Sequence, residues 1–186
     1  THHRSSAASD VYKRQHESRI WIRKNEPLTV SPNNVPVPDY FPDIPIVREA
    51  IARKYSNIEA LDKEIGLLME KFERDGVLEN SIIFFWSDHG GNLLRQKRAV
   101  GNSGLHVPLI IRYPDGYRAG ETDSRMVSLM DLGPTVMSIL GIEPPSYMDG
   151  KAFAGFYKDD PRKYIFGSAD RFDESTDMQR SVLDGR

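Results

Sequence analysis

The chain has 186 residues, of which 39% are hydrophobic and 28% are charged, and its formal net charge is −2. This composition is typical of a globular protein that is long enough to bury a sizeable core. The weak net charge gives no reason to expect nucleic acid or an anionic membrane surface as a partner, and no apolar stretch is long enough to cross a bilayer. The sequence contains no cysteine, which excludes disulfides, zinc–thiolate sites and a thiol nucleophile within this chain.

The first part of the chain contains one strong helix signal. Residues 1–15 are polar and without periodicity, so we expect a leader or a library-derived tail there, and a folded domain over residues 16–186. Residues 25–45 are rich in proline and indicate an extended surface segment. From Ile51 to Phe72, apolar residues recur at spacings of three and four. This periodicity predicts a long amphipathic helix that packs on a core and ends at Gly76.

Strand signals dominate the second part. The uninterrupted apolar run at 82–86, within a predicted strand at 81–86, is typical of a strand that is buried on both faces of a parallel sheet. A second apolar run at 107–113 predicts another strand, which ends at a turn. Further strands are predicted at 125–130 and 164–168. Between these two, a helix is expected that Asp131 caps, with Pro134 in its first turn and Gly141 at its end. Because strands alternate with helices, we predict an α/β fold with a largely parallel central sheet flanked by helices.

The sequence Ser87-Asp88-His89-Gly90 follows the first apolar run directly. Ligands of open α/β sheets bind outside the carboxyl ends of such strands. An aspartate and a histidine delivered there by a glycine turn could hold a metal ion, although Asp-His-Gly also occurs in ordinary turns. From the tripeptide alone, both interpretations stay open.

Three features in fixed order resemble the sulfatase family of the alkaline phosphatase superfamily. They are the strand that ends in Asp88-His89-Gly90, the basic loop that contains Lys97, and the next strand, which opens with Gly104-Leu105-His106-Val107-Pro108. The interval from Lys97 to Pro108 is similar to the family's lysine-to-proline interval. The resemblance continues in the long helix and in Asp131-Leu132-Gly133-Pro134-Thr135, and it covers roughly residues 16–186. It implies a partial alkaline-phosphatase-like sandwich.

The resemblance also implies roles for individual residues. Asp88 and His89 would belong to the site of one divalent cation, Ca²⁺, which neutralises a sulfate ester as a Lewis acid. Asp88 would supply a carboxylate ligand, and His89 a ring nitrogen or a hydrogen bond to a neighbouring ligand. Lys97 would contact a sulfate oxygen or the developing leaving group, and His106 would lie on the leaving-group side, although a structural role at a strand entrance is equally open for it. The acidic segment from Asp170 to Asp177 is expected to be a solvated face.

One departure from the family bears on activity. Sulfatases of type I carry a Cys/Ser-x-Pro/Ala-x-Arg motif that is oxidised to formylglycine, and no serine of this chain lies in such a motif. We therefore expect the carboxy-terminal part of a sulfatase catalytic domain that lacks the upstream nucleophile half and is inactive alone. The implied substrate is a sulfated small molecule or glycan. The family is compatible with the periplasm or the extracellular space.

Two alternatives stay open at this point. The chain could instead belong to a related phosphodiesterase or phosphonate monoester hydrolase, which an upstream nucleophile motif would distinguish. It could also be an α/β remnant that binds a partner or a metal without turnover. A sulfate-ester assay and a calcium titration would separate the enzymatic from the non-enzymatic interpretation.

Overall fold

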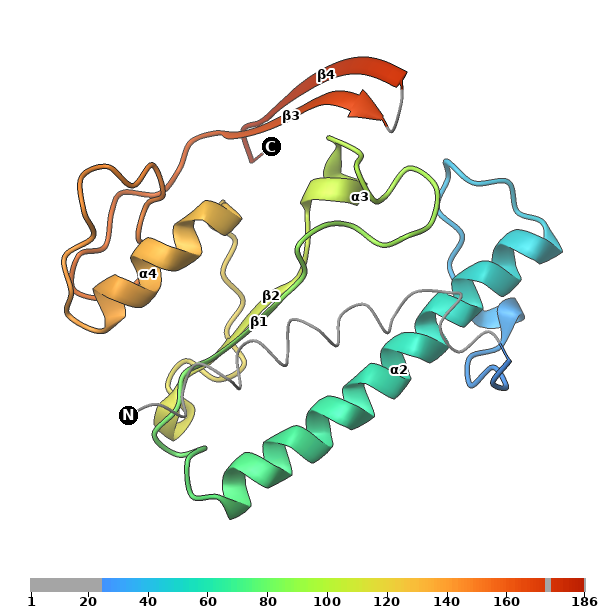
Figure 1. Cartoon of the computed structure of the whole chain (residues 1–186). Helices are drawn as coiled ribbons and strands as arrows, with labels where there is room; N and C mark the ends of the chain where they lie inside the picture. Colours follow the sequence, from blue (N-terminus) through green and yellow to red (C-terminus); the bar gives the residue numbers. More distant parts are fainter. Residues whose placement is uncertain (1–24, 173–174, 186) are drawn as a thin grey trace. The chain divides into compact units, whose positions relative to one another are not determined.

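In the computed structural model, residues 25–172 and 175–185 are described (Figure 1). The predicted leader, residues 1–15, lies outside the described residues. The chain divides into two compact units. Among the described residues, unit 1 comprises residues 25–97 together with His106–Ala119, and unit 2 comprises Arg98–Leu105 together with residues 120–172 and 175–185. No helix in the described part of the chain is long and apolar enough to span a membrane.

The long helix predicted in unit 1 is α2, Pro45–Arg74. It begins six residues before the first residue of the apolar stripe, because Pro45 occupies the first turn, where a missing N–H costs no hydrogen bond. Gly76 adopts a left-handed φ of 66° just beyond the helix, and its N–H donates to the Glu73 carbonyl at 2.9 Å. The predicted stop at Gly76 is therefore confirmed, since a left-handed residue is a common helix ending.

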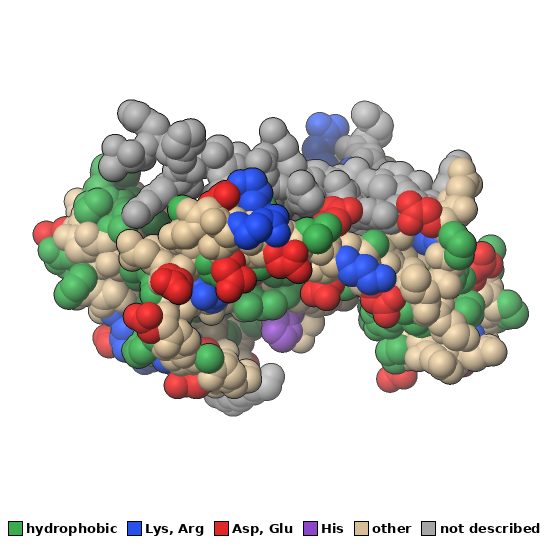
Figure 2. Space-filling view, turned by 90° about the horizontal axis from the view of Figure 1, so that it is seen from below, with side chains coloured by type: hydrophobic (Ala, Val, Ile, Leu, Met, Phe, Trp, Pro, Cys, Tyr) green, Lys and Arg blue, Asp and Glu red, His purple; other side chains and the backbone are tan. Residues whose placement is uncertain are grey.

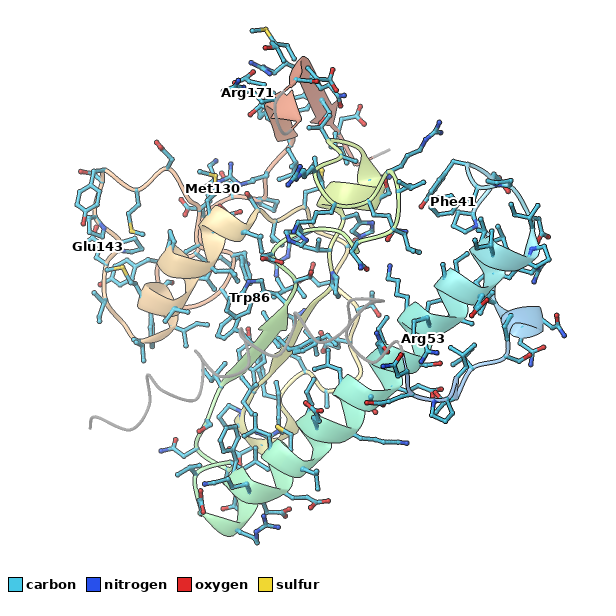
Figure 3. All side chains as sticks on the ribbon, turned by 45° about the vertical axis from the view of Figure 1, so that its right-hand side comes forward. Phe41, Arg53, Trp86, Met130, Glu143 and Arg171 are labelled. Atoms are coloured by element: carbon cyan, nitrogen blue, oxygen red, sulfur yellow. The ribbon has the colours of Figure 1, made fainter. Side chains whose placement is uncertain are left out.

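The proline-rich segment before α2 supplies the partners of the helix's first half. This segment contains a short 3-10 helix, η2 (Pro32–Asn34). Val35 packs with Ile51 and Ala52 in the core of unit 1, and Phe41, labelled in Figure 3, lies against this core. The Ser56 hydroxyl accepts hydrogen bonds from two backbone N–H groups of the segment at 3.1 Å each. The segment therefore differs from the extended surface segment that we predicted, because it contains turns and a 3-10 helix and buries Val35 against α2.

Two short strands of unit 1 form a separate ladder. Strand β1 is Ile83–Trp86 and β2 is Leu109–Arg112. They pair antiparallel, with Ile83 opposite Arg112 and Trp86 opposite Leu109. Each strand lies within one of the two predicted apolar runs. A short 3-10 helix, η3 (Pro114–Gly116), follows β2 at the predicted turn.

The mixed helix-and-strand character that we expected is confirmed, but the direction of the pairing differs. Both sheets among the described residues are two-stranded and antiparallel, whereas the apolar runs led us to expect mainly parallel neighbours. The expected burial on both faces is also not found, because every residue of β1 is only half-buried and Ile110 of β2 is 61% exposed. Apolar runs are typical of buried parallel strands, but the partner that a strand finds decides its direction and its burial.

Unit 2 is built around a short helix. It contains α3 (Asn102–Leu105), the 3-10 helix η4 (Leu129–Asp131) and α4 (Leu132–Ile139). Gly141 has a φ of 73° and lies just beyond α4, as predicted. Residues 125–128 form no strand, in contrast to our expectation. The Ser128 N–H donates to the Asp131 carboxylate at 2.8 Å, so this part of the backbone bonds locally instead of joining a ladder.

An exposed hairpin follows in unit 2. Strand β3, Ile165–Phe172, overlaps the predicted strand at 164–168 and extends beyond it, and it pairs antiparallel with β4, Ser175–Leu183. The second strand was not predicted, because its sequence is mostly polar and most of its residues are exposed. Figure 2 shows one face of the molecule, on which acidic and basic side chains are interspersed, in keeping with the weak net charge.

Candidate functional site

Asp88 and His89 lie directly after β1, as the sequence predicts. Trp86, labelled in Figure 3, is the last residue of β1, and the Ser87 N–H donates to the Pro108 carbonyl at 3.3 Å. The ladder therefore ends beside the turn that carries the pair. The His89 Nε2 and Asp88 Oδ1 atoms are 3.6 Å apart, and about a third of each side chain is exposed. The two side chains are therefore close together and partly accessible to solvent.

The hydrogen bonds of the turn fix the tautomer of His89. Its Nδ1 atom lies 2.8 Å from the Gly90 carbonyl oxygen. Because a carbonyl can only accept, Nδ1 donates this hydrogen bond, and in the neutral ring the lone pair is then on Nε2. The Ser87 hydroxyl donates to the His89 carbonyl at 2.6 Å, which holds the backbone of the turn. A histidine whose second nitrogen is bound to a carbonyl is the usual arrangement of a metal ligand.

The donor set fits part of a divalent-cation site. A carboxylate oxygen and an imidazole nitrogen converge, but the described residues contain no group of three or more histidine, aspartate or glutamate side chains that could hold a metal ion. An oxygen-ligand Ca²⁺ site takes six to eight ligands. Asp88 and His89 therefore fit two positions of such a site, and further ligands would have to come from elsewhere.

Lys97 lies in a tightly turned loop. Its backbone N–H donates to the Gly91 carbonyl at 2.7 Å. Its half-buried side chain makes no hydrogen bond or ion pair with any described residue. Arg95 and Arg98, on either side, have left-handed φ values of 59° and 68°, which are uncommon for arginine. Such backbone outliers are frequent at functional sites, so we include this loop in the candidate site.

The other predicted site residue, His106, is exposed and lies three residues before the start of β2. Within the described part of unit 1, no hydrogen bond or ion pair joins His106 or Lys97 to Asp88 or His89. The structure thus brings the predicted metal ligands together, while the roles of Lys97 and His106 stay predictions. In the acidic segment of unit 2, Asp170 pairs with Arg180 at 2.5 Å on the exposed hairpin.

One residue beside the loop was missed by the sequence reasoning. The Lys54 amine on α2 donates to Gln96 Oε1 at 2.8 Å, and Gln96 Nε2 donates to the Tyr40 hydroxyl at 3.4 Å. Burial lowers the pKa of Lys54. The signal was present in the sequence, because Lys54 shares the helical spacing of Ile51, Ile58 and Leu61 and therefore belongs to the apolar stripe.

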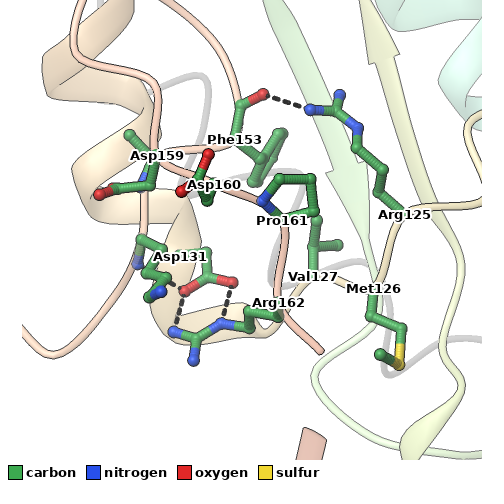
Figure 4. Close-up of a pocket in the computed structure, with 11 residues that line it drawn as sticks. Arg125, Met126, Val127, Asp131, Phe153, Asp159, Asp160, Pro161 and Arg162 are labelled. Carbon is green, nitrogen blue, oxygen red and sulfur yellow. Dashed lines mark hydrogen bonds and ion pairs between the residues drawn. The ribbon is translucent and has the colours of Figure 1, made fainter. Parts of the chain in front are cut away.

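A second polar centre lies in unit 2 (Figure 4). The Arg162 guanidinium donates to both carboxylate oxygens of Asp131, at 2.5 and 2.8 Å. The backbone N–H groups of Lys151 and Ser128 also donate to this carboxylate. The Asp131 side chain was predicted to cap α4, but it makes no such bond and instead forms a capping box with Ser128 at the start of η4. The Asp131 carboxylate thus accepts four hydrogen bonds, all from groups of the protein itself. We therefore assign this centre a structural role.

The surroundings of Asp131 shift its pKa. Burial raises the pKa of this carboxyl, but the hydrogen bonds from Arg162 and from the backbone of Lys151 and Ser128 outweigh burial and hold the pKa below its usual range. The shallow hollow that Asp131 lines, together with Arg125, Asp159 and Pro161, has an empty volume of about 250 Å³ that includes open solvent. Because the hydrogen bonds of the Asp131 centre are made within the protein, we place the candidate active site at the Asp88–Lys97 loop and not at this hollow.

Comparisons with known proteins agree on one family. A family model described as Sulfatase matches residues 3–142. An ulvan-active sulfatase of Formosa agariphila is 45% identical over 150 residues, which cover 81% of this chain and 25% of that protein. A human N-sulphoglucosamine sulphohydrolase is 30% identical over 122 residues, covering 65% of this chain and 24% of that protein. The chain thus spans about a quarter of the length of these curated relatives.

Solved structures give the same result for the fold. A structure in complex with its substrate D-glucosamine-2-N,6-O-disulfate has a TM-score of 0.64 and 25% identity, and the match covers 79% of this chain and 33% of the other. A phosphonate monoester hydrolase from Silicibacter pomeroyi has a TM-score of 0.54 and 22% identity, over 89% of this chain and 33% of the other. This second likeness supports an alkaline-phosphatase-like α/β fold. Sulfatases in general use a formylglycine and a divalent cation. By its match to the family model, this chain belongs to the sulfatase family.

Proposed function

We propose that this chain is part of a sulfatase that hydrolyses sulfate monoesters on carbohydrate. The observation that carries the proposal is the pair Asp88 and His89, which converge to 3.6 Å at the end of β1 inside the segment that matches the family. The loop that follows brings a lysine without a carboxylate partner among the described residues. A divalent cation and a lysine are the groups that neutralise a sulfate ester during attack at sulfur.

Each residue then has a defined task. Asp88 and the Nε2 atom of His89 would hold one divalent cation, for which we propose Ca²⁺ because a hard cation prefers oxygen ligands. When bound, the cation supplies Lewis-acid neutralisation of the sulfate oxygens. Lys97 would donate hydrogen bonds to a sulfate oxygen or to the oxygen of the departing alcohol. His106 would protonate or orient the leaving group.

The carbohydrate substrate rests on relatives. The Formosa agariphila protein is named an ulvan-active sulfatase, and an N-acetylglucosamine-6-O-sulfatase of Bacteroides thetaiotaomicron is 36% identical over 99 residues. Since these names share a sulfated sugar, we propose a sulfated glycan or sugar as the substrate class. The 186 residues contain no formylglycine motif, so we propose that the nucleophile is supplied by further polypeptide.

A chimera tests the proposal directly. The segment of the Formosa agariphila sulfatase that matches this chain would be replaced by the matching 150-residue segment of this chain, and hydrolysis of an aryl sulfate and of sulfated ulvan fragments would be measured. We expect the chimera to turn over sulfate esters, and the isolated 186-residue chain to show no turnover and only weak calcium binding in calorimetry. Turnover by the isolated chain would contradict the division of the site.

Variants of the chimera test the individual roles. Asp88→Ala should abolish activity because the cation loses a carboxylate, whereas Lys97→Ala should lower kcat by about a hundredfold, the usual size for one donor at a developing charge. Lys63→Ala, which changes an exposed lysine of α2, is the matched control and should leave kcat unchanged. A chimera that hydrolyses phosphonate monoesters but not sulfate esters would favour the related hydrolase instead.

A further inference from the structure

Lys54 is a cation in the apolar face of α2, and its amine contacts the loop that joins Asp88 to Lys97. Its partner among the described residues is the Gln96 side-chain oxygen, at 2.8 Å. Gln96 is only 9% exposed, so this hydrogen bond lies beneath the loop surface. A half-buried ammonium without a carboxylate is unfavourable, and burial accordingly lowers the pKa of Lys54. An apolar residue would fill this position of the stripe at lower cost.

The contact extends from the side chains to the loop backbone. A Cβ atom added to Gly91 would lie 2.4 Å from the Lys54 Nζ atom and 2.6 Å from Gln96 Oε1, so the backbone of Gly91 rests directly on the hydrogen-bonded pair. The carbonyl of this same glycine accepts the Lys97 N–H at 2.7 Å. Contacts therefore run without interruption from Lys54 on the helix to the backbone of Lys97.

The loop itself needs such a restraint. Arg95 and Arg98 hold left-handed φ values of 59° and 68°, a conformation that non-glycine residues keep only where their surroundings fix it. Gln96 lies between them and is tied to α2 by Lys54 and to the proline-rich segment by Tyr40. The side chain of Gln96 thus anchors the part of the loop that carries Lys97.

On the basis of the sulfatase function proposed above, we propose that Lys54 is a positioning residue: through Gln96 and Gly91 it holds the Asp88–Lys97 loop in the conformation that presents Lys97 to the sulfate ester. Lys54 touches neither substrate nor cation in this arrangement. It acts by fixing where the backbone of Lys97 lies relative to the turn of Asp88 and His89.

Amide hydrogen exchange on the 186-residue chain tests the proposal without any need for turnover. In Lys54→Met, which removes the donor, the Lys97 and Gln96 amides should exchange about tenfold faster, as expected for loss of one hydrogen bond to a charged group. Gln96→Leu should give the same increase, and the double variant should exceed neither single change, because both remove one interaction. Gln96→Glu keeps an acceptor for Lys54 and should preserve protection.

Two controls separate positioning from general stability. The Val77 amide, which bonds the Phe72 carbonyl at 3.0 Å beyond the end of α2, should keep its exchange rate in all variants. Lys63→Met makes the same substitution at an exposed position of the same helix and should leave the loop amides unchanged. Unchanged loop exchange in Lys54→Met, or an equal increase at Val77, would overturn the proposal. Neither result would bear on the sulfatase activity, which the chimera measures separately.

Discussion

Removing Arg162 should destabilise unit 2 strongly. The Asp131 side chain is 2% exposed and that of Arg162 is 18% exposed, so Arg162→Met leaves a buried carboxylate without its counter-charge. Two charge-assisted hydrogen bonds are lost, at about 1.5–3 kcal/mol each. Breaking a buried pair by removing one partner costs about 3–5 kcal/mol in other proteins. Because Ser128 and Lys151 still donate to Asp131, we expect a loss of about 3 kcal/mol at pH 7.

The pH dependence of this loss has a definite sign. The folded pKa of Asp131 is held below its usual range, so the pair's contribution is fully present above the ordinary pKa of about 3.9 and disappears as the pH falls through the lowered value. In Arg162→Met, burial acts without the guanidinium, so Asp131 takes up its proton at higher pH. The difference in unfolding free energy between the two proteins should therefore shrink as the pH is lowered from 7 to about 3.

The assay has to report on unit 2 alone. The sequence of unit 2 contains no tryptophan, so tryptophan fluorescence would not follow this unit. Hydrogen exchange of residues 128–157 in increasing urea measures the free energy of opening around Asp131 instead. Arg180→Met is the matched control, since Arg180 and Asp170 are 59% and 61% exposed and such pairs contribute about 0–1 kcal/mol. A loss in Arg162→Met no larger than in this control would refute the reasoning.

Two glycine substitutions should have opposite effects on thermal stability. Gly66 lies inside α2 with open space around its Cβ position, so Gly66→Ala should stabilise the helix by about 0.5–1 kcal/mol and raise its Tm by about 2–4 °C per kcal/mol. Gly155 has a φ of 93°, and a Cβ atom added there would lie 2.4 Å from the Ser138 backbone carbon, so Gly155→Ala should lower the Tm. Calorimetry measures both variants, and an unchanged Tm in either one would contradict the expectation for that variant.

Local periodicity predicted the elements of unit 1 well. The stripe from Ile51 to Phe72 and the stop at Gly76 specify α2 because both depend on neighbours within a few residues. The two apolar runs located β1 and β2 for the same reason. The Asp88–His89 pair could also be placed, since it follows β1 directly and its two side chains are adjacent in the chain.

Features that depend on distant partners could not be predicted. The antiparallel direction of β1 and β2 depends on how the two strands meet, and neither strand's own sequence specifies it. Arg162 meets Asp131 across 31 residues, and nothing near either residue distinguishes it from an exposed charge. Strand β4 has little alternation because its polar side chains face solvent, so only its ladder with β3 defines it.

The connection between β1 and β2 has a consequence for the order of folding. Leu28–Phe41 and the first half of α2 are close in sequence, so they can associate early. Trp86 and Leu109 pair only after residues 87–108 have closed into a loop, and the entropy lost in that closure grows with loop length. Contacts between distant residues slow folding, so this ladder should form late. The residues that carry the proposed chemistry lie within this connection, and shortening it to speed folding would remove them.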